Sequence, residues 1–382
     1  MRILQLGKFY PIRGGVEKVM WDLTRGLAQK GVGCDMLCAM RRSASIDLKD
    51  AQYHEYIGKR SIFRFGNGCR IYTIPAFGKI AGTMFAPGMI PWLKRHKKNY
   101  DIIHIHHPDP MAALALRLSH FRGKVVLHWH SDIVSQKFFL LFYKPLQRWL
   151  IKRADVIIGT TPVYLKASSW LRKVQDKCVA VPIGIDPVEI DPDRAAIIKR
   201  RFPKQRLILT IGRLVPYKGY PYLIEAMQQL PEEYHLVIGG TGPMKKKLRK
   251  QVEKADLTTR VTMPGFISYA EIADWYGAAD LFVLSSIMRS EAFGIVQIEA
   301  MSCGKPVVAT TIPGSGVSWV NKEGVSGLNA EPRNAKALAD AILLVDKEHE
   351  RFSEGARNLF NERYTLDHMI EGVKAVYDKL LN

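Results

Sequence analysis

The chain has 382 residues, 47% of them hydrophobic, which suits a two-domain globular protein and excludes an intrinsically disordered one. No apolar run approaches the roughly 20 residues that span a bilayer, and the N-terminal segment becomes polar after Leu6, unlike a secretory signal. The five cysteines are scattered without a CxxC pair, so we expect free buried thiols in a reducing cytoplasm and no zinc site.

The net charge of +20 is concentrated in the first half of the chain. Residues 1–185 contain 30 Lys and Arg against 11 Asp and Glu, whereas residues 186–382 contain 26 against 25. Solubility alone would not require this segregation. We therefore expect the first half to bind an anionic partner. The candidates are phospholipid headgroups, a lipid phosphate and nucleic acid.

Strand-like and helix-like segments alternate along the whole chain. In the first half, strands are predicted at Arg2–Leu6, Cys34–Cys38, Ile102–Ile105, Val125–His128 and Val156–Ile158, with a helix at Val16–Gln29. In the second half, strands are predicted at Leu207–Ile211, His235–Ile238, Val261–Met263, Leu281–Leu284 and Val307–Ala309, and helices at Tyr222–Gln229, Met244–Ala255, Ala335–Asp346 and Tyr364–Asn382. This rhythm predicts an α/β protein whose parallel sheets are covered by helices on both faces.

The rhythm is interrupted once, between Pro182 and Asp193, where Gly, Asp and Pro are frequent. Such a stretch is typical of an interdomain linker. We therefore expect domains at 1–185 and 186–364, with a final helix at 365–382 that returns to the first domain.

The most informative motif is the segment Ser290–Pro306, which follows the predicted strand Leu281–Leu284. Ligands of open parallel sheets bind beyond the carboxyl ends of the strands. Gly294 lets the backbone come close to a ligand, and the N–H groups at the start of the following helix can hold phosphate or sugar oxygens. A carboxylate at Glu299 can accept two hydrogen bonds from a ribose diol.

This segment closely resembles the signature of the group 1 glycosyltransferases, in which two glutamates eight positions apart, here Glu291 and Glu299, precede a Gly-Lys/Arg-Pro-Val-Val sequence. The resemblance covers essentially the whole chain, is more specific in the second half, and extends to bacterial mannosyltransferases of O-antigen assembly. It implies the GT-B fold, with two Rossmann-like domains facing each other across a cleft. It also implies transfer with retention of configuration from a nucleotide-sugar donor in the second domain to an acceptor in the first, with no required cofactor or metal.

The resemblance assigns roles to the segment Gly212–Gly219, which follows the strand Leu207–Ile211. In the family, the arginine and lysine of this segment, here Arg213 and Lys218, bind the donor diphosphate. Arg213 can form paired hydrogen bonds to phosphate oxygens, and Lys218 supplies a compact positive charge. Both would stabilise the negative charge of the leaving nucleoside diphosphate.

The remaining donor-site residues are expected from the same resemblance. Gly239–Pro243 fits either a turn at the donor site or an ordinary strand-to-helix turn, and both interpretations stay open. Phe266 and the backbone of Ile267 are expected beside the nucleobase. The complete expected set in the second domain is Arg213, Lys218, Gly240, Phe266, Ile267, Glu291, Phe293, Gly294, Ile295 and Glu299.

The first domain contributes two expected site elements. Gly14-Gly15 resembles the family's glycine loop, so Gly15 is expected at the donor or acceptor; a full GxGxxG fingerprint is missing, which argues against a dehydrogenase. His130, in His128–Asp132, matches the family histidine that contacts the donor sugar. His130, Arg213, Lys218 and Glu291 are the residues expected to take part in catalysis.

Two features raise the question of a metal. His104, His106 and His107 lie along one predicted strand, with His104 and His106 on the same face, which leaves open polar contacts, ordinary packing or metal ligation. Asp191-Pro-Asp193 matches the Asp-x-Asp pattern of metal-dependent transferases, but it precedes a helix-like segment, so we expect a helix cap. No metal site is predicted.

Two basic segments of the first half, Met89–Lys98 and Lys137–Arg153, interleave aromatic and aliphatic residues with positive charge. This pattern favours contact with an anionic membrane, and a buried helix with solvated ends is the alternative. We therefore expect a cytoplasmic enzyme at the inner membrane face that transfers mannose from GDP-mannose to a lipid-linked saccharide. The alternatives are a UDP-sugar donor with another acceptor, an epimerase or phosphorylase of the same fold, and a nucleic-acid-binding protein, although no nucleic-acid motif is present.

Overall fold

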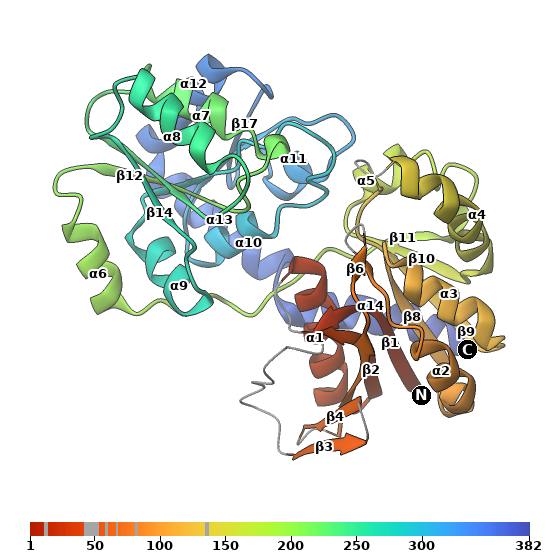
Figure 1. The fold of residues 1–382 in the computed structure, drawn as a ribbon. Coiled ribbons are helices and arrows are strands. Elements are labelled where there is room, and N and C mark those ends of the chain that lie inside the picture. Colours follow the sequence, from red (N-terminus) through yellow and green to blue (C-terminus); the bar gives the residue numbers. More distant parts are fainter. Residues whose placement is uncertain (11–13, 42–52, 58–59, 66–67, 81–82, 134–136) are drawn as a thin grey trace. The chain divides into compact units, whose positions relative to one another are not determined.

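The computed structural model describes residues 1–10, 14–41, 53–57, 60–65, 68–80, 83–133 and 137–382. The chain forms two compact units (Figure 1). Unit 1 comprises Met1–Ile183 and Leu366–Asn382, and unit 2 comprises Gly184–Thr365.

Unit 1 is built on a nine-stranded sheet with the order β11-β10-β9-β8-β1-β2-β5-β4-β3. Its strands are β1 (Arg2–Tyr10), β2 (Gly33–Arg41), β3 (Tyr53–Ile57), β4 (Arg60–Arg64), β5 (Arg70–Ala76), β8 (Ile102–His107), β9 (Lys124–Trp129), β10 (Val156–Gly159) and β11 (Cys178–Ala180). The strands from β11 to β5 pair in parallel, as the sequence predicts for the five strands it identifies in this half, whereas β5 and β11 are not predicted. The expectation of parallel sheets alone is wrong at one edge, because β3, β4 and β5 pair antiparallel. A further pair, β6 (Lys79–Ile80) and β7 (Thr83–Met84), forms a separate two-stranded sheet.

Helices cover both faces of the unit 1 sheet. They are α1 (Gly15–Gln29), α2 (Met89–His96), η1 (Lys97–Asn99), α3 (Pro110–Ser119), α4 (Lys137–Arg153), α5 (Pro162–Ala167), η2 (Gln175–Lys177) and α14 (Leu366–Leu381). The last helix, α14, packs against α1, where the side chain of Ile370 lies over Gly26. This packing brings Tyr377 of α14 onto the sheet, where its hydroxyl bonds to Gln5, a residue 372 positions earlier in the sequence.

The structure divides the basic segment Met89–Lys98 into a buried and an exposed part. Met89, Trp92 and Leu93 are buried, and the Trp92 ring packs on Tyr72 at a centroid distance of 4.8 Å. The expectation that its aromatic and aliphatic residues rest on a membrane is therefore wrong for Met89, Trp92 and Leu93, because unit 1 itself covers them, whereas Ile90 is half-buried and Pro91 is exposed. Lys94, Arg95 and Lys98 are exposed. In the second basic segment, the side chains of 137–142 lie outside the described residues. No helix within the described part of the chain is long and apolar enough to cross a membrane.

Unit 2 contains a six-stranded parallel sheet with the order β14-β13-β12-β15-β16-β17. Its strands are β12 (Arg206–Ile211), β13 (Tyr234–Gly239), β14 (Val261–Gly265), β15 (Leu281–Val283), β16 (Val307–Thr310) and β17 (Gly327–Ala330), of which only β17 is not predicted from the sequence. This is the strand order of a doubly wound sheet whose direction of winding changes between β12 and β15.

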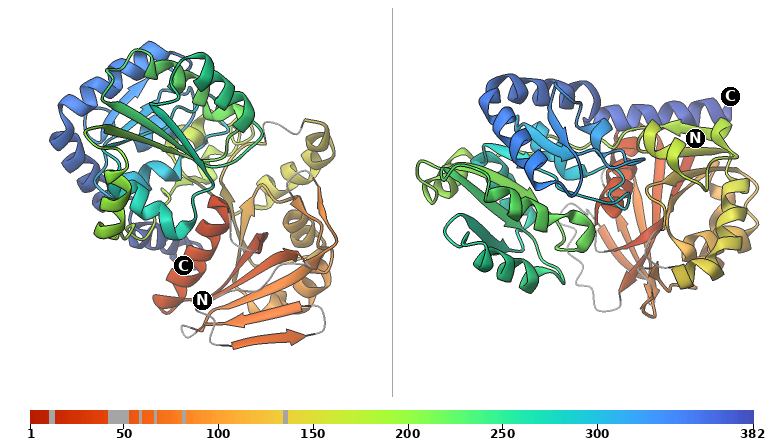
Figure 2. Two further views of the ribbon diagram at one scale, coloured as in Figure 1. Left: turned by 60° about the vertical axis from the view of Figure 1, so that its left-hand side comes forward. Right: turned by 90° about the horizontal axis from the view of Figure 1, so that it is seen from above.

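Figure 2 shows helices on both faces of the unit 2 sheet. They are α6 (Pro192–Arg200), η3 (Pro216–Lys218), α7 (Tyr220–Met227), α8 (Lys245–Lys254), α9 (Tyr269–Ala278), α10 (Ile295–Ser302), α11 (Val317–Val320), α12 (Ala335–Lys347) and α13 (His349–Arg363). The side chain of Asp191 accepts hydrogen bonds from the N–H groups of Asp193 and Arg194 at the start of α6. The prediction that Asp191-Pro-Asp193 is a helix cap is confirmed.

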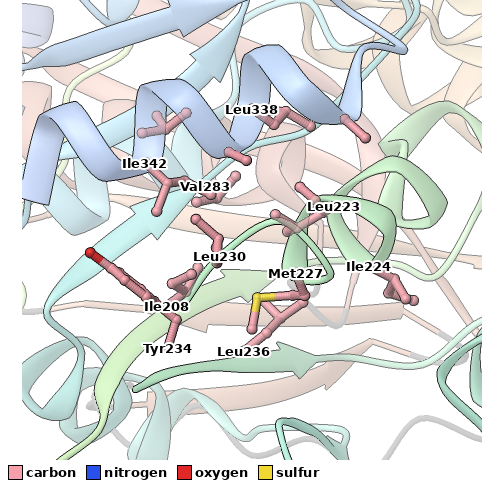
Figure 3. Packing of buried hydrophobic residues seen from close by; sticks show 14 of the residues in the cluster. Ile208, Leu223, Ile224, Met227, Leu230, Tyr234, Leu236, Val283, Leu338 and Ile342 are labelled. Carbon is pink, nitrogen blue, oxygen red and sulfur yellow. The ribbon is translucent and has the colours of Figure 1, made fainter. Parts of the chain in front are cut away.

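The core of unit 2 fixes the strands from which the motif loops leave. Figure 3 shows Ile208 of β12 and Leu236 of β13 packing beside Leu223 of α7 and Leu338 of α12. These four residues are fully buried or 1% exposed.

All five cysteines of the chain are free, as predicted; three are buried and two, Cys178 and Cys303, are partly exposed.

Candidate active site

The sharpest feature of unit 2 is a buried ion pair at the position where the winding of its sheet changes. Lys218 lies in η3 after β12, and Glu291 lies in the loop after β15. Nζ of Lys218 is 2.6 Å from Oε2 of Glu291, and the hydroxyl of Ser286 donates to the same carboxylate oxygen at 2.9 Å. The side chains of Lys218 and Glu291 are only 9% and 12% exposed. Two residues that the sequence singles out, 73 positions apart, are thus in direct contact.

The charge of this pair is set by its surroundings. Burial by itself lowers the pKa of Lys218, but the Glu291 carboxylate and the oxygens of Tyr217 and Tyr220 outweigh burial, so the pKa lies above its usual value. The ammonium group therefore stays charged at neutral pH. Arg213, from the same loop, is exposed. The loop after β12 thus presents one fixed and one accessible positive charge, a combination suited to phosphate oxygens.

Glycines allow the loops at this edge of the sheet to touch. Gly219 has φ of 68°, and a Cβ there would lie 2.0 Å from the carbonyl oxygen of Ser285. Gly240 has φ of 135°, and a Cβ there would lie 1.9 Å from the carbonyl oxygen of Gly212. The N–H of Gly240 also donates to the carbonyl oxygen of Gly265 at 2.6 Å. Loop packing alone accounts for glycine at 240, and its contact with a ligand remains a prediction.

Phe266 and Ile267 follow β14, and their side chains lie in opposite environments. Phe266 is 73% exposed, whereas Ile267 is 8% exposed and packs against Gly239. An exposed aromatic ring at the carboxyl end of a strand suits stacking on a planar group.

The segment between the two glutamates forms a tight turn into α10. Gly294 has φ of 77°, in the left-handed region, and a Cβ there would meet Leu284 and Gln297 below 3 Å. The ring of Phe293 is buried edge-on against Tyr364, and its carbonyl accepts a hydrogen bond from Nε2 of Gln297 at 3.0 Å. The side chain of Phe293 is therefore a core residue. In the first turn of α10 the N–H of Gln297 donates to the carbonyl oxygen of Gly294 at 2.9 Å, and the N–H groups of Ile295 and Val296, which come before it, are suited to an anion or hydroxyl.

Glu299 projects from α10 and is half-buried. Its Oε2 accepts a hydrogen bond of 2.8 Å from the hydroxyl of Tyr276 on α9. Burial and the neighbouring carboxylate hold the pKa of Tyr276 well above its usual value, so the hydroxyl remains a donor. Neither Tyr276 nor Ser286 was predicted from the sequence, because nothing in the spacing of these residues marks them as partners of Glu299 and Glu291.

In unit 1, His130 lies just beyond β9 within a row of buried imidazoles. His104 and His106 of β8 lie on the same face of the sheet as His128 and His130, since His106 pairs in register with His128. The rings stack, with the centroids of His128 and His130 4.1 Å apart at 11°. Burial, as the largest cause, lowers the pKa of all four histidines, and that of His128 falls to about 3.

The spacing of the histidine nitrogens would allow a metal ion, but their hydrogen bonds and ring orientations argue against one. His104, His106 and His128 each offer one nitrogen within 4.8 Å of the others. However, both ring nitrogens of His106 already have hydrogen-bond partners, Oε1 of Gln5 at 2.8 Å and Nε2 of His130 at 2.9 Å. The rings also stack instead of converging on one point, as ligands about 2.1 Å from a zinc ion would. The arrangement fits packing and hydrogen bonding. His107 lies on the other face, stacked on Trp129 at 3.8 Å.

The glycine loop of unit 1 is described only in part. Gly14 and Gly15 are at the start of α1, where Gly15 is exposed, and residues 11–13 of the loop lie outside the described residues. Lys8, just before the loop, is buried; its N–H donates to Asp109 at 2.6 Å, and its Nζ donates to the carbonyl of Pro108 at 2.6 Å. This contact joins the carboxyl ends of β1 and β8.

Both halves of the chain match known families. Residues 13–189 match the model described as Glycosyltransferase Family 4, and residues 193–359 match Glycosyl transferases group 1. The chain is 32% identical over 324 residues to alpha-D-kanosaminyltransferase of Streptomyces kanamyceticus, which covers 78% of this chain and 83% of that protein. The chain belongs to the group 1 glycosyltransferases. This glycosyltransferase is also 29% identical to O-antigen chain mannosyltransferase C of Escherichia coli over 100% of this chain and 99% of that protein.

Comparison with solved structures of other proteins identifies the fold. Anabaena HepE in complex with UDP-glucose superposes with a TM-score of 0.77 at 19% identity, covering 99% of this chain and 100% of that one. The glycosyltransferase therefore has the GT-B fold, with two Rossmann-like units.

Proposed function

We propose that this glycosyltransferase transfers mannose, with retention of configuration, from GDP-mannose to a lipid-linked saccharide in the synthesis of a cell-surface polysaccharide such as an O-antigen. The full-length similarity to an O-antigen chain mannosyltransferase supports the sugar and the acceptor class. The proposed donor site is in unit 2, and the proposed acceptor site is in unit 1.

The buried pair of Lys218 and Glu291 is the observation that carries the proposed donor site. An ammonium group fixed by a carboxylate beyond the carboxyl ends of the paired strands β12 and β15 is preorganised for a diphosphate, and exposed Arg213 adds a second positive charge. Glu299, held by Tyr276, is proposed to bind the ribose hydroxyls. Phe266, Ile267 and Gly240 are proposed to line the base and phosphates.

The proposed mechanism relies on positioning and charge stabilisation. Glu291 and the backbone of Phe293, Gly294 and Ile295 orient the sugar, which His130 also contacts. Arg213 and Lys218 stabilise the leaving diphosphate as the glycosidic bond breaks. The leaving phosphate oxygen accepts the proton of the incoming hydroxyl on the same face of the sugar, so retention needs no enzymic nucleophile.

Thermal unfolding with a panel of GDP, UDP, ADP, GDP-mannose and UDP-glucose tests the donor. GDP and GDP-mannose are expected to raise Tm, because a ligand that binds only the folded state stabilises it by mass action. Glu299→Ala is expected to abolish the shift relative to its own unliganded Tm. The matched control is Glu253→Ala on the exposed side of α8, which should keep the shift.

Each outcome of the panel separates two hypotheses. A selective rise with UDP compounds would replace GDP-mannose by a UDP-sugar. A chain that no nucleotide stabilises would contradict the donor site itself.

A further inference from the structure

A continuous row of hydrogen bonds crosses the buried face of the unit 1 sheet and ends at His130. The hydroxyl of Tyr377 on α14 lies 3.1 Å from Nε2 of Gln5 and also bonds to Nδ1 of His104. Oε1 of Gln5 lies 2.8 Å from Nε2 of His106, and Nδ1 of His106 lies 2.9 Å from Nε2 of His130. His130 keeps 5% of its surface exposed, and the other members are fully buried.

The amide of Gln5 fixes the direction in which protons are donated along this row. Its oxygen can only accept, so Nε2 of His106 carries a proton. Burial keeps both His106 and His130 neutral, because it lowers the pKa of each well below its usual value. A neutral imidazole has a single N–H, so Nδ1 of His106 accepts and Nε2 of His130 donates. At the other end, Nε2 of Gln5 donates to Tyr377, whose hydroxyl donates to His104.

We propose that Gln5 and His106, held by Tyr377, are positioning residues that keep His130 in the tautomer with its proton on Nε2 and a lone pair on Nδ1. Resting on the proposed function, in which His130 contacts the donor sugar, this means that His130 meets the sugar as a hydrogen-bond acceptor. Its partner is then a sugar hydroxyl and not an ether or phosphate oxygen. Among the described residues, the buried nitrogens without a partner on this face belong to His104 and His128 and not to His130, which agrees with an accessible Nδ1.

Histidine nitrogen shifts measured by NMR test the tautomer directly. In the free enzyme labelled with ¹⁵N-histidine, His104, His106 and His130 are each expected to carry the proton on Nε2, with His130 assigned from the spectrum of His130→Gln. A proton on Nδ1 of His106 or His130 would overturn the proposal. Because this measurement needs no donor, its failure is distinct from failure of the proposed function, which nucleotide binding tests.

Kinetic variants test whether the row acts through His130. His106→Leu removes the acceptor, and we expect kcat/KM to fall about tenfold with loss of the slowly exchanging Nε2 proton of His130. His106→Asn places an amide oxygen near the position of Nδ1 and is expected to restore kcat/KM to within about threefold of wild type.

His128→Leu is the matched control for His106→Leu. It removes another buried imidazole on the same face of the sheet, which stacks on His130 at 4.1 Å, but both ring nitrogens of His128 lack hydrogen-bond partners among the described residues. We expect His128→Leu to keep the Nε2 proton of His130 and most of the activity. An equal fall in kcat/KM for His128→Leu and His106→Leu, or no recovery of kcat/KM in His106→Asn, would mean that these side chains only fill space. Either result would overturn the proposal.

Zinc provides one more discriminating outcome. A Zn²⁺ ion held by His104, His106 and His128 would take a nitrogen of His106 away from Gln5 or His130. Histidine spectra that are unchanged between EDTA and added ZnCl₂ support the hydrogen-bonded row. A zinc-dependent shift of His106, with metal bound in equal amount to protein, would overturn it.

Discussion

At the scale of the residue, Lys218 and Glu291 are charged groups that have lost most of their water and depend on each other. Removing one partner of a buried ion pair leaves an uncompensated buried charge, which typically costs about 3–5 kcal/mol. We expect Lys218→Met to lower the free energy of unfolding by this amount in urea titrations. Lys218→Met with Glu291→Gln is expected to recover at least half of the loss, since no unpaired charge remains.

An exposed ion pair of the same length is the control for this prediction. Lys336 and Asp340 on α12 are also 2.6 Å apart, but their side chains are 73% and 59% exposed. Lys336→Met is expected to cost less than about 0.5 kcal/mol. If Lys218→Met costs no more than Lys336→Met, Lys218 is not held in the buried charged pair.

The neutral histidines of unit 1 predict how stability depends on pH. Burial lowers the pKa of His128 to about 3, whereas an unfolded histidine takes up a proton below about 6.5. Between these values the unfolded state binds more protons, so the stabilisation is complete above about pH 6.5 and is lost as the pH falls, by about 1.4 kcal/mol per pH unit for each such histidine. We expect His128→Leu to flatten the slope of unfolding free energy against pH by that amount.

Urea unfolding at a series of mildly acidic pH values measures this slope. His120→Asn is the control, because His120 is exposed and has a positive φ of 53° that asparagine tolerates. A wild-type slope in His128→Leu would mean that His128 is protonated in the folded enzyme.

At the scale of the element, glycines decide how closely the strand ends of unit 2 approach. Gly240→Ala would put a methyl group 1.9 Å from the carbonyl oxygen of Gly212, so the backbone must shift. Gly324 also has a positive φ, of 72°, but nothing lies within 4 Å of its Cβ position. Gly240→Ala adds this contact to a φ of 135°, which is less accessible to alanine than the φ of 72° at Gly324, so we expect it to be less stable than Gly324→Ala by at least about 2 kcal/mol in urea unfolding. Equal stability would show that the loops adjust freely.

The sequence predicts elements well where their pattern is local. The five predicted strands of unit 2 are present because each is a short run rich in aliphatic and β-branched residues, and Asp191 begins α6 as expected. The antiparallel pair of β3 and β4 was missed because polar residues interrupt these short edge strands. The same limit applies to the site: Glu291 and Lys218 stand out in motifs, whereas Gln5 and Tyr377 meet only because the chain returns through α14.

At the scale of the whole molecule, the segregation of charge is the property that local motifs do not explain. The first half, with 30 basic and 11 acidic residues, carries nearly all of the net charge of +20. Because Met89, Trp92 and Leu93 of α2 are buried, the expected attraction to an anionic membrane is mainly electrostatic, through exposed residues such as Lys94, Arg95 and Lys98. Basic residues near an anionic surface contribute about 1 kcal/mol each.

Vesicle co-sedimentation tests this attraction. We expect the enzyme to bind vesicles of mixed phosphatidylcholine and phosphatidylglycerol, to bind pure phosphatidylcholine poorly, and to be released by high salt, which screens the charges. Changing Lys94, Arg95 and Lys98 together to Glu is expected to weaken binding by roughly a hundredfold or more, as the loss of three such contacts implies.

The control must change the net charge equally at another place. Lys246, Arg249 and Lys250 are exposed on α8 of unit 2, in the half of the chain whose 26 basic and 25 acidic residues nearly balance. Changing these three to Glu lowers the net charge by the same amount, so a general charge effect would weaken binding equally in both triple variants. A loss confined to the α2 variant would assign the membrane contact to unit 1. Equal loss in both would leave only the total charge of the protein as the cause, and tight binding by the α2 variant would remove α2 from the contact.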